Sequence, residues 1–216
     1  WRTIGHDRAV NHLRRSIDED RLSHAYLVSG PQSVGKMTLA MDIARAANCV
    51  GEAIPCATCD PCDRIEKGLH ADVQITGVES ERSGISINQI RAIQQNAALT
   101  PYEGRTRVFI LSDAEHLTDE ASNSLLKTLE EPPGRTMLIL LTRTSASIPE
   151  TIISRCHLLE LRPVPVPIVS DGLQSLYDTD ADVPDETARL STGLMGGAMR
   201  PATDRANSPS HQSCGK

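Results

Sequence analysis

AYLVSGPQSVGK, residues 25–36, is the stretch of this sequence that decides its fold. Its first five residues form a short apolar run that is typical of a buried strand, and the remainder fits the pattern G-x-x-x-x-G-K of a phosphate-binding loop. Gly30 and Gly35 allow backbone N–H groups to wrap a phosphate, and Lys36 neutralises its charge. Residues 36–48 are predicted to form a helix, whose positive N-terminal end also attracts phosphate. The alternative, a glycine-rich turn without a ligand, is disfavoured because the spacing and both flanking elements match.

The residue after the lysine departs from the complete form of this loop. A Ser or Thr is expected there, because its hydroxyl holds Mg²⁺. Met37 offers no oxygen, and Thr38 stands one residue too late. We therefore expect Mg²⁺ to be held poorly, and two outcomes stay open: the loop binds ATP without cleaving it, or it binds no nucleotide.

Outward from this loop, short apolar strands alternate with helices along the chain. Such alternation predicts an α/β fold with a parallel sheet and helices on both of its faces. Only 2% of the residues are aromatic, so we expect an aliphatic core. Further strands are predicted at residues 107–111, 137–141 and 158–161, and helices at 7–20, 85–99, 120–131 and, as a short turn, 148–156.

Four of the six cysteines gather in one segment, with the spacing Cys49-x6-Cys56-x2-Cys59-x2-Cys62. Steps of the form C-x-x-C allow two sulfurs to reach one tetrahedral metal at about 2.3 Å. Without a secretory signal, such a cluster indicates metal binding rather than disulfides. Four thiolates with no open position predict a structural zinc site in an insertion at residues 49–62. The alternative is a loop of reduced cysteines without a metal.

Length, charge and hydropathy exclude several classes of protein. The 216 residues allow one full domain and a smaller one. The net charge of -6 argues against nucleic-acid binding through overall charge, and no apolar run of about 18 residues is present to span a membrane. The N-terminus resembles no signal peptide and has no Met, so we expect a cytoplasmic protein and a chain that is a fragment.

A second departure follows the strand predicted at residues 107–111. In ATPases with a phosphate-binding loop, such a strand ends in Asp-Glu: the Asp supports Mg²⁺ and the Glu activates water. Here Ser112 takes the first position, and Asp113, one methylene shorter than Glu, takes the second. A loop acid or helix cap is as good an interpretation of Asp113 as a catalytic base. Glu115 is a candidate substitute two residues further along.

Three more stretches carry the pattern of a known family. They are SHAYL at residues 23–27, NSLLKTLEEPP at 123–133 and IPETIISRC at 148–156. Together with the cysteine cluster, these stretches resemble the bacterial DNA polymerase III clamp loader, an AAA+ assembly. The resemblance covers residues 4 to about 200, and the run LLKTLEEPP is its most specific part.

The resemblance implies a division of the chain into domains. An AAA+ P-loop domain is expected over residues 1–163, with the zinc insertion inside it, and a small helical lid over residues 164–200. Residues 201–216 are rich in Ser, Pro and Asn and are predicted to be disordered. The helical collar that holds the family's subunits in a ring is expected to be absent from this chain.

Two types of subunit in that family share these motifs: the gamma/tau motor, with a complete ATPase site, and the delta-prime subunit, whose site is usually degraded. Met37 and Ser112 resemble delta-prime, as does Gly196, which stands where the motor carries an Arg that senses the γ-phosphate. Thr142 falls at or next to a second sensor position. The resemblance implies a delta-prime-like subunit without hydrolysis of its own. The alternative is a gamma/tau-type motor that hydrolyses ATP itself.

The motif Ser154-Arg155-Cys156 survives intact. In this family the Arg is a finger that is presented in trans to ATP bound by a neighbour, where it stabilises transition-state charge. The alternative is an arginine in a surface salt bridge. The resemblance implies support of ATP-driven loading of the sliding clamp onto primed DNA, within the DNA polymerase III holoenzyme. Its partners would be the gamma/tau and delta subunits, the clamp and primed DNA, with no membrane. A zinc-ribbon nucleic-acid binder is disfavoured by the acidic balance.

Overall fold

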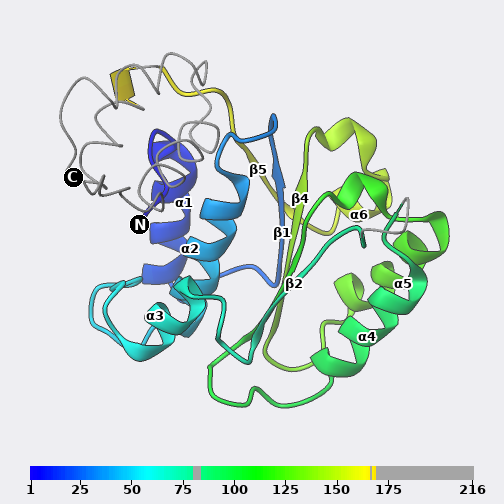
Figure 1. Cartoon of the computed structure of the whole chain (residues 1–216), viewed down its shortest axis with the longest axis horizontal. Helices are drawn as coiled ribbons and strands as arrows, with labels where there is room; N and C mark the ends of the chain where they lie inside the picture. The colour runs from blue at the N-terminus through cyan, green and yellow to red at the C-terminus, as the bar shows by residue number, and fades with distance from the viewer. Residues whose placement is uncertain (80–83, 166, 169–216) are drawn as a thin grey trace, which may run out of the picture.

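Five parallel strands form the centre of the structure, a computed structural model that describes residues 1–79, 84–165 and 167–168 (Figure 1). Their order across the sheet is β2-β3-β4-β1-β5, so the strand before the phosphate loop, β1, lies between β4 and β5. The predicted α/β fold with a parallel sheet is confirmed. The strands are β1 (Ala25–Ser29), β2 (Val73–Thr76), β3 (Arg107–Leu111), β4 (Thr136–Thr142) and β5 (His157–Glu160).

The register of the strands brings their carboxyl ends to one side of the sheet. Ser29, the last residue of β1, pairs with Thr142 of β4 and with Glu160 of β5. We call this side, where the strands end, the carboxyl edge, and the side where they begin the amino edge. The segments that follow β1, β3 and β4 therefore meet at the carboxyl edge, where parallel sheets bind their ligands.

Helices cover both faces of the sheet, as predicted. Figure 1 shows α1, α2 and α3 on one side of the strands and α4, α5 and α6 on the other. The helices are α1 (Asp7–Asp18), α2 (Lys36–Asn48), α3 (Asp60–Glu66), α4 (Ile87–Ala97), α5 (Asp119–Glu130) and α6 (Glu150–Ile153), with short 3₁₀ turns η1 (Ala114–His116) and η2 (Ser145–Ser147).

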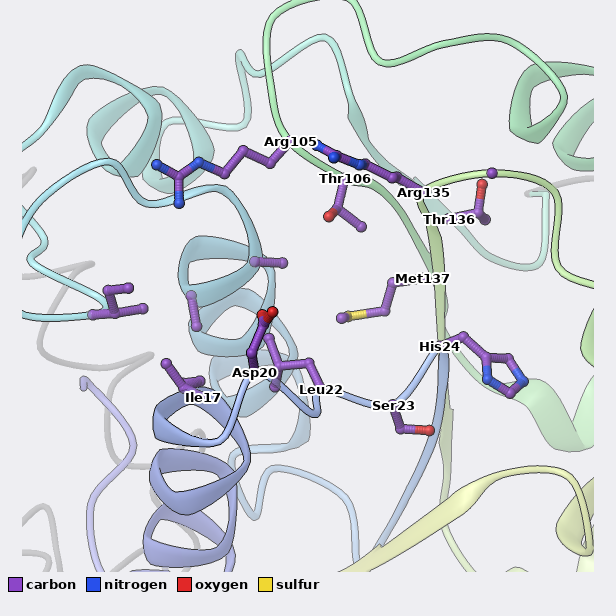
Figure 2. A pocket seen from close by; sticks show the side chains of 14 residues that line it. Ile17, Asp20, Leu22, Ser23, His24, Arg105, Thr106, Arg135, Thr136 and Met137 are labelled. Carbon is purple, nitrogen blue, oxygen red and sulfur yellow. The ribbon is translucent and has the colours of Figure 1, made fainter.

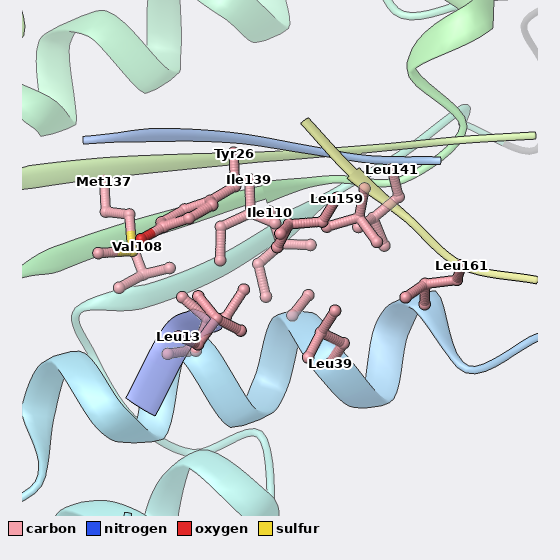
Figure 3. Close-up of a cluster of buried hydrophobic side chains, with 14 of the residues drawn as sticks. Leu13, Tyr26, Leu39, Val108, Ile110, Met137, Ile139, Leu141, Leu159 and Leu161 are labelled. Carbon is pink, nitrogen blue, oxygen red and sulfur yellow. The ribbon is translucent and has the colours of Figure 1, made fainter. Parts of the chain in front are cut away.

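Each face of the sheet has its own apolar core, and β4 shows how the two are divided. Ile139 and Leu141 pack in the core shared with α1 and α2 (Figure 3), whereas Leu138 and Leu140 pack in the core shared with α4 and α5. Successive side chains of a strand point to opposite faces. The odd-numbered residues of β4 therefore face the helix that follows the phosphate loop. Apart from Tyr26, Phe109 and the thioether Met137, the buried side chains of both cores are aliphatic, as expected.

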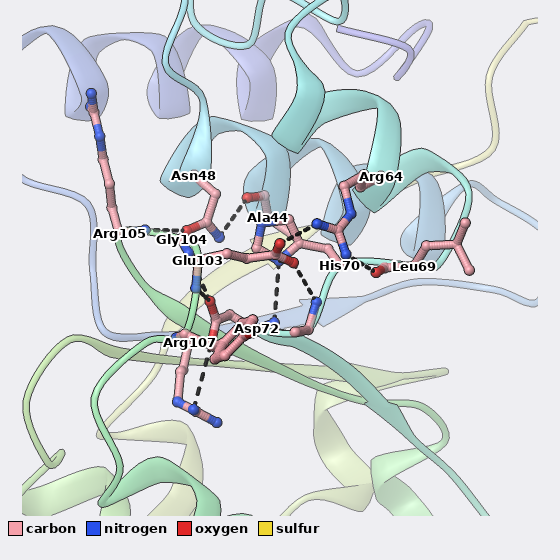
Figure 4. A network of polar contacts seen from close by, with 12 residues as sticks. Ala44, Asn48, Arg64, Leu69, His70, Asp72, Glu103, Gly104, Arg105 and Arg107 are labelled. Carbon is pink, nitrogen blue, oxygen red and sulfur yellow. Dashed lines mark hydrogen bonds and ion pairs between the residues drawn. The ribbon is translucent and has the colours of Figure 1, made fainter.

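A buried polar network ties α2 to the loop that leads into β3 (Figure 4). The carboxylate of Asp72 accepts hydrogen bonds from the backbone N–H groups of residues 102–104 at 2.7 to 2.8 Å. The amide oxygen of Asn48 accepts from the N–H groups of residues 105–106 at 2.8 and 2.9 Å. Burial raises the pKa of Asp72, but the three N–H donors and the nearby Arg107 outweigh it and leave that pKa below its ordinary value.

One strand and one α-helix were not predicted, and both have a local reason. Strand β2 lies at the edge of the sheet, where Ile75 is half exposed, so it lacks the continuous apolar run of the buried strands. Helix α3 begins directly after Cys59 within the cysteine segment, which was interpreted only as an insertion. The strand predicted at residues 158–161 begins one residue earlier, at His157.

The predicted lid at residues 164–200 and the disordered tail at residues 201–216 lie almost wholly outside the described residues. Both stay predictions, and so does the interpretation of Gly196. Among the helices of the described part of the chain, none is long and apolar enough to cross a membrane.

Candidate nucleotide and metal sites

The phosphate loop joins β1 to α2 at the carboxyl edge, and its two glycines are required there for different reasons. A Cβ on Gly30 would stand 2.5 Å from the carbonyl oxygen of Leu161, closer than real side chains approach a backbone. Gly35, the residue just before α2, has φ +104°, in the left-handed region that favours glycine. The two glycines therefore allow the loop to pass close to Leu161 and to turn into the N-terminal end of α2.

Lys36 lies in a pocket of about 270 Å³ beside this loop. Its ammonium donates to the carbonyl oxygens of Gly30 at 2.6 Å and Pro31 at 2.8 Å. Partial burial lowers the pKa of Lys36, while the negative charges of Glu115 and Asp113 act in the opposite direction. The pocket is lined by Gln32, Ser33, Gly35, Lys36, Met37, Thr38, Ser112, Asp113, Leu141 and Arg143. The loop, the lysine and the helix start fit a bound phosphate.

Two acidic side chains approach this pocket from the segment after β3. Asp113 is exposed, has φ 55° and precedes η1, but its side chain makes no capping hydrogen bond. The helix-cap alternative thus has no side-chain contact in its support, and the base role stays a prediction. Both carboxylate oxygens of Glu115 are buried and have no hydrogen-bond partner among the described residues. Its nearest cationic partner is Arg143, whose Nε lies 3.6 Å from Oε1.

The oxygen ligands of a divalent metal are not assembled in this pocket. Met37 lines it with a thioether, whereas Mg²⁺ prefers oxygen. Ser112, which stands where an Asp would support Mg²⁺, donates its hydroxyl to the carbonyl oxygen of Thr76 at 3.3 Å. The residues present therefore fit phosphate but do not fit the Mg²⁺ site of a complete ATPase.

The end of β4 contributes Arg143 to the pocket, and Thr142 is turned elsewhere. The hydroxyl of Thr142 donates to the carbonyl oxygen of Thr144 at 3.0 Å and lies 3.4 Å from Oγ of Ser147. Leu141 and Arg143, on the odd-numbered side of β4, line the pocket instead. Arg143 was not among the residues predicted from the sequence, although the two-residue alternation of β4 points to it. The sensor role of Thr142 stays a prediction.

The four clustered cysteines converge, as their spacing predicts. Their sulfur atoms all lie within 4.8 Å of one another, and Sγ of Cys49 is 3.9 Å from Sγ of Cys59. A tetrahedral site with metal–sulfur bonds of about 2.3 Å needs sulfurs about 3.8 Å apart. Cys49 and Cys62 are buried, and Cys56 and Cys59 are partly buried. The donor set and its geometry fit a closed structural zinc site.

Backbone N–H groups prepare part of this cluster for metal binding. Hydrogen bonds from Thr58 and from the N–H of Cys59 lower the pKa of Cys56 to about 5. Burial instead raises the pKa of Cys49, although N–H groups of Gly51 and Cys56 point at its sulfur. Because only thiolates bind zinc, a cluster with one readily ionised thiol is suited to begin metal uptake.

Arg155 lies just after α6, on the surface next to the end of α5. Its Nη2 donates to the carboxylate of Glu130 at 2.6 Å, and its Nη1 donates to the carbonyl oxygen of Thr151 at 2.9 Å. The salt bridge expected under the alternative interpretation is therefore present in the isolated chain. Its side chain is about one third exposed and that of Glu130 is half exposed, so the guanidinium remains within reach of a partner.

A larger pocket, of about 470 Å³, opens at the amino edge of the sheet (Figure 2). Arg105 and Arg135 line it from the loops that lead into β3 and β4, and His24 and Met137 lie on its other side. Nε2 of His24 is hydrogen-bonded to the carbonyl oxygen of Leu129 at 3.1 Å. No predicted nucleotide or zinc residue lines this pocket, so the larger cavity is not the one that carries the phosphate motif.

The sequence matches one family of DNA polymerase III subunits. Residues 5–165 match the family described as DNA polymerase III, delta subunit. The chain is 39% identical over 188 residues to DNA polymerase III subunit delta′ of Bacillus subtilis, covering 87% of this chain and 55% of that protein. It is 30% identical over 210 residues to the tau subunit of Escherichia coli, covering 94% of this chain and 32% of that protein. The chain thus spans about half or less of the length of these relatives.

Solved structures show the same fold at low identity. The RuvB Holliday junction branch migration motor of Thermotoga maritima superimposes with a TM-score of 0.63 at 19% identity, over 93% of this chain and 61% of that one. A protein from the same organism described as related to the DNA polymerase III gamma subunit gives a TM-score of 0.51 at 20% identity, over 92% and 62%. These likenesses concern the fold alone, and they agree with the predicted α/β fold with a parallel sheet.

Proposed function

We infer the function from one premise: this chain belongs to the DNA polymerase III clamp-loader family of delta-prime and gamma/tau subunits. We propose that it works as a delta-prime-like subunit that supports ATP-driven loading of the sliding clamp onto primed DNA. Its partners would be the gamma/tau and delta subunits, and it would reach the clamp and DNA through the assembled complex. In this role the subunit contributes Arg155 to the ATP of its neighbour.

The position of Arg155 in the sheet carries this proposal. It precedes β5, whose first residue, His157, pairs with Tyr26, so Arg155 lies roughly level with His24 at the amino edge. The phosphate loop begins beyond Ser29, five residues further along, which is about 17 Å at about 3.3 Å per residue. An arginine side chain at one edge is too short to reach a phosphate at the other. Any nucleotide that Arg155 contacts therefore belongs to another subunit.

The chemistry of a guanidinium suits that role. Its planar fork of N–H donors matches the oxygens of a phosphoryl group, and it keeps its charge at all physiological pH values. An arginine supplied in trans stabilises the charge of the transition state and raises turnover by about 10³ to 10⁵. Such a contribution needs no metal ligands in the subunit that supplies it, which agrees with Met37 and Ser112 in this chain.

The test is the DNA-stimulated ATP turnover of the reconstituted clamp loader, with Arg155→Ala in this subunit. We expect turnover at the adjacent motor site to fall by about 10³. Glu130→Gln is the matched control, because it removes the ion pair of Arg155 but leaves the guanidinium, and turnover should stay within about twofold. Unchanged turnover with Arg155→Ala would refute the finger role. Equal losses in both variants would instead indicate a structural salt bridge.

A second candidate, a gamma/tau-type motor, is favoured by the preserved loop with Lys36 and by the likeness to tau. It requires that this chain hydrolyse ATP by itself in the presence of Mg²⁺, and that Lys36→Ala abolish the hydrolysis. Arg155→Ala should then leave the hydrolysis of the isolated chain unchanged, because Arg155 lies at the opposite edge. Met37 offers no oxygen, and Ser112 offers a hydroxyl in place of the carboxylate that supports Mg²⁺, which speaks against this candidate.

A further inference from the structure

The phosphate pocket contains a second cation for which the loop motif does not account. Arg143 follows β4 and lines the pocket together with Lys36. The odd-numbered residues of β4 face α2, and this alternation, continued one step past the strand, carries Arg143 to the same side as the loop. The two cationic side chains thus reach one pocket from two different segments of the carboxyl edge.

The orientation of Arg143 leaves its phosphate-binding groups available. Its Nε is the atom nearest Glu115, at 3.6 Å, and the side chain is 60% exposed. No hydrogen bond joins its guanidinium to another of the described residues, so both Nη groups are free to donate. An arginine offers five N–H donors in a fixed fork, which suits the oxygens of a phosphate.

Glu115 explains why Arg143 is held beside the phosphate pocket. Its two carboxylate oxygens are buried without a hydrogen-bond partner in the described part of the chain, and the side chain as a whole is 11% exposed. A buried carboxylate is costly unless a cation is near. Arg143 is the nearest cation, so Glu115 is a positioning residue that draws the guanidinium toward the mouth of the pocket.

We propose that Arg143 takes the place of the divalent metal in this pocket: with Lys36 it binds the terminal phosphates of a nucleoside di- or triphosphate directly, so that binding needs no Mg²⁺. The inference rests on the proposed function in one respect: it assumes, as expected for a member of this family, that the phosphate loop binds a nucleotide. It is independent of Arg155, which lies at the other edge. It also agrees with the loss of both Mg²⁺ contacts at Met37 and Ser112.

The closing experiment is equilibrium binding of a fluorescent ATP analogue to this chain, in EDTA and in MgCl₂. We expect the wild-type dissociation constant to differ less than about threefold between the two conditions. Arg143→Gln should weaken binding about tenfold or more in both, because a charged hydrogen-bond donor to phosphate is lost. Arg135→Gln is the matched control, an exposed arginine at the opposite end of the same strand, and should leave binding unchanged.

Glu115→Gln separates the proposal from a metal site rebuilt around Glu115. If Glu115 positions Arg143, this variant weakens binding a few-fold, equally in EDTA and in MgCl₂. Binding that needs Mg²⁺, is lost in Glu115→Gln and persists in Arg143→Gln would overturn the proposal, and so would a wild-type chain that binds no nucleotide. Equal melting temperatures of all variants would exclude misfolding. The turnover assay with Arg155→Ala gives its answer whatever the result here, so the two proposals fail separately.

Discussion

The two edges of the sheet differ in what they retain of an ATP site. At the carboxyl edge the loop and Lys36 remain, but Met37 and Ser112 stand where oxygen ligands of Mg²⁺ are expected. At the amino edge Arg155 remains within an intact motif on the surface, where its partners among the described residues are Glu130 and nearby backbone and hydroxyl oxygens. The groups that we propose to hold a nucleotide and the arginine that we propose to act on a neighbour's nucleotide are therefore separated by the length of a strand.

Under the proposed function, this separation would allow ATP hydrolysis at the carboxyl edge to be lost while the role of Arg155 at the amino edge is kept. A substitution at Met37 or Ser112 should change contacts at the carboxyl edge alone, because the fully buried strands β1 and β4 lie between the two edges. Arg155 depends on α5, α6 and the start of β5, none of which contributes to the phosphate pocket. The comparison predicts that variants at the two edges behave independently.

The largest effect on ATP turnover of the assembled clamp loader is expected from Arg155→Lys, with Lys36→Ala as the comparison. Lysine keeps the charge but loses the planar fork, so turnover at the adjacent motor should fall by about 10² to 10³. Lys36→Ala at the carboxyl edge should change turnover less than twofold. DNA-stimulated phosphate release measures both. If Lys36→Ala were as harmful as Arg155→Lys, the division between the edges would be wrong.

Removal of zinc should have the next largest effect. It compares the four-cysteine site, which has all its metal ligands, with the phosphate pocket, which lacks the usual Mg²⁺ ligands. Zinc-bound thiolates stabilise small folded units by several kcal/mol, so a strong chelator should lower the melting temperature markedly. The same treatment should not reduce binding of the ATP analogue at the phosphate pocket. Cobalt substitution would show the absorption of a tetrahedral thiolate site, lost in Cys59→Ser and kept in the control Cys156→Ser. A metal content near zero in the purified chain would contradict the zinc assignment.

Asp72→Asn should act on the amino edge alone, through stability. The carboxylate accepts three backbone N–H groups, and its loss should cost about 2 kcal/mol. Because the folded pKa of Asp72 lies below its ordinary value of 3.8, its stabilisation is present above that value and is lost as the pH falls through the folded pKa. The urea concentration at the midpoint of unfolding, measured at a series of pH values, should therefore fall less steeply toward acid pH for Asp72→Asn than for wild type. ATP-analogue binding near neutral pH should be unchanged.

The smallest effect should come from restoring the metal ligands at the carboxyl edge. Met37→Thr combined with Ser112→Asp supplies the hydroxyl and carboxylate that hold Mg²⁺ in complete ATPases. We expect MgCl₂ to tighten nucleotide binding by about tenfold over EDTA in this double variant, where wild type shows little difference. Each single variant serves as its control and should show a smaller response. No gain in the double variant would mean that Arg143 and Glu115 exclude the metal by themselves.

Local spacing was sufficient for the parts of the sites that lie close together in the chain. The glycines and Lys36 of the loop, and the four cysteines, each fall within one short segment, so their residue types and intervals dictate a common geometry. The strands β1, β3 and β4 were also predictable, because burial on both faces demands continuous apolar runs. The edge strand β2 was not predicted because its side chains are only partly buried, so its sequence has no continuous apolar run.

Contacts between distant segments were out of reach of the sequence. The pair Arg155–Glu130 joins residues 25 positions apart, and Arg143–Glu115 joins residues 28 positions apart. Neither pair has a spacing that a helix or a strand imposes. Each exists because the order of the strands in the sheet brings the two segments to the same edge.

The sequence by itself determined that this chain carries a phosphate loop without the usual Mg²⁺ contacts, a four-cysteine cluster and an intact Ser154-Arg155-Cys156 motif. These are properties of residue type and short-range spacing, which persist whatever the rest of the chain does. Only the tertiary structure decided that Arg155 lies at the edge away from the loop, and that Arg143 rather than Thr142 lines the phosphate pocket. Both depend on parallel register and on the two-residue alternation of β4, and a shift of one residue would reverse which side chain faces the pocket.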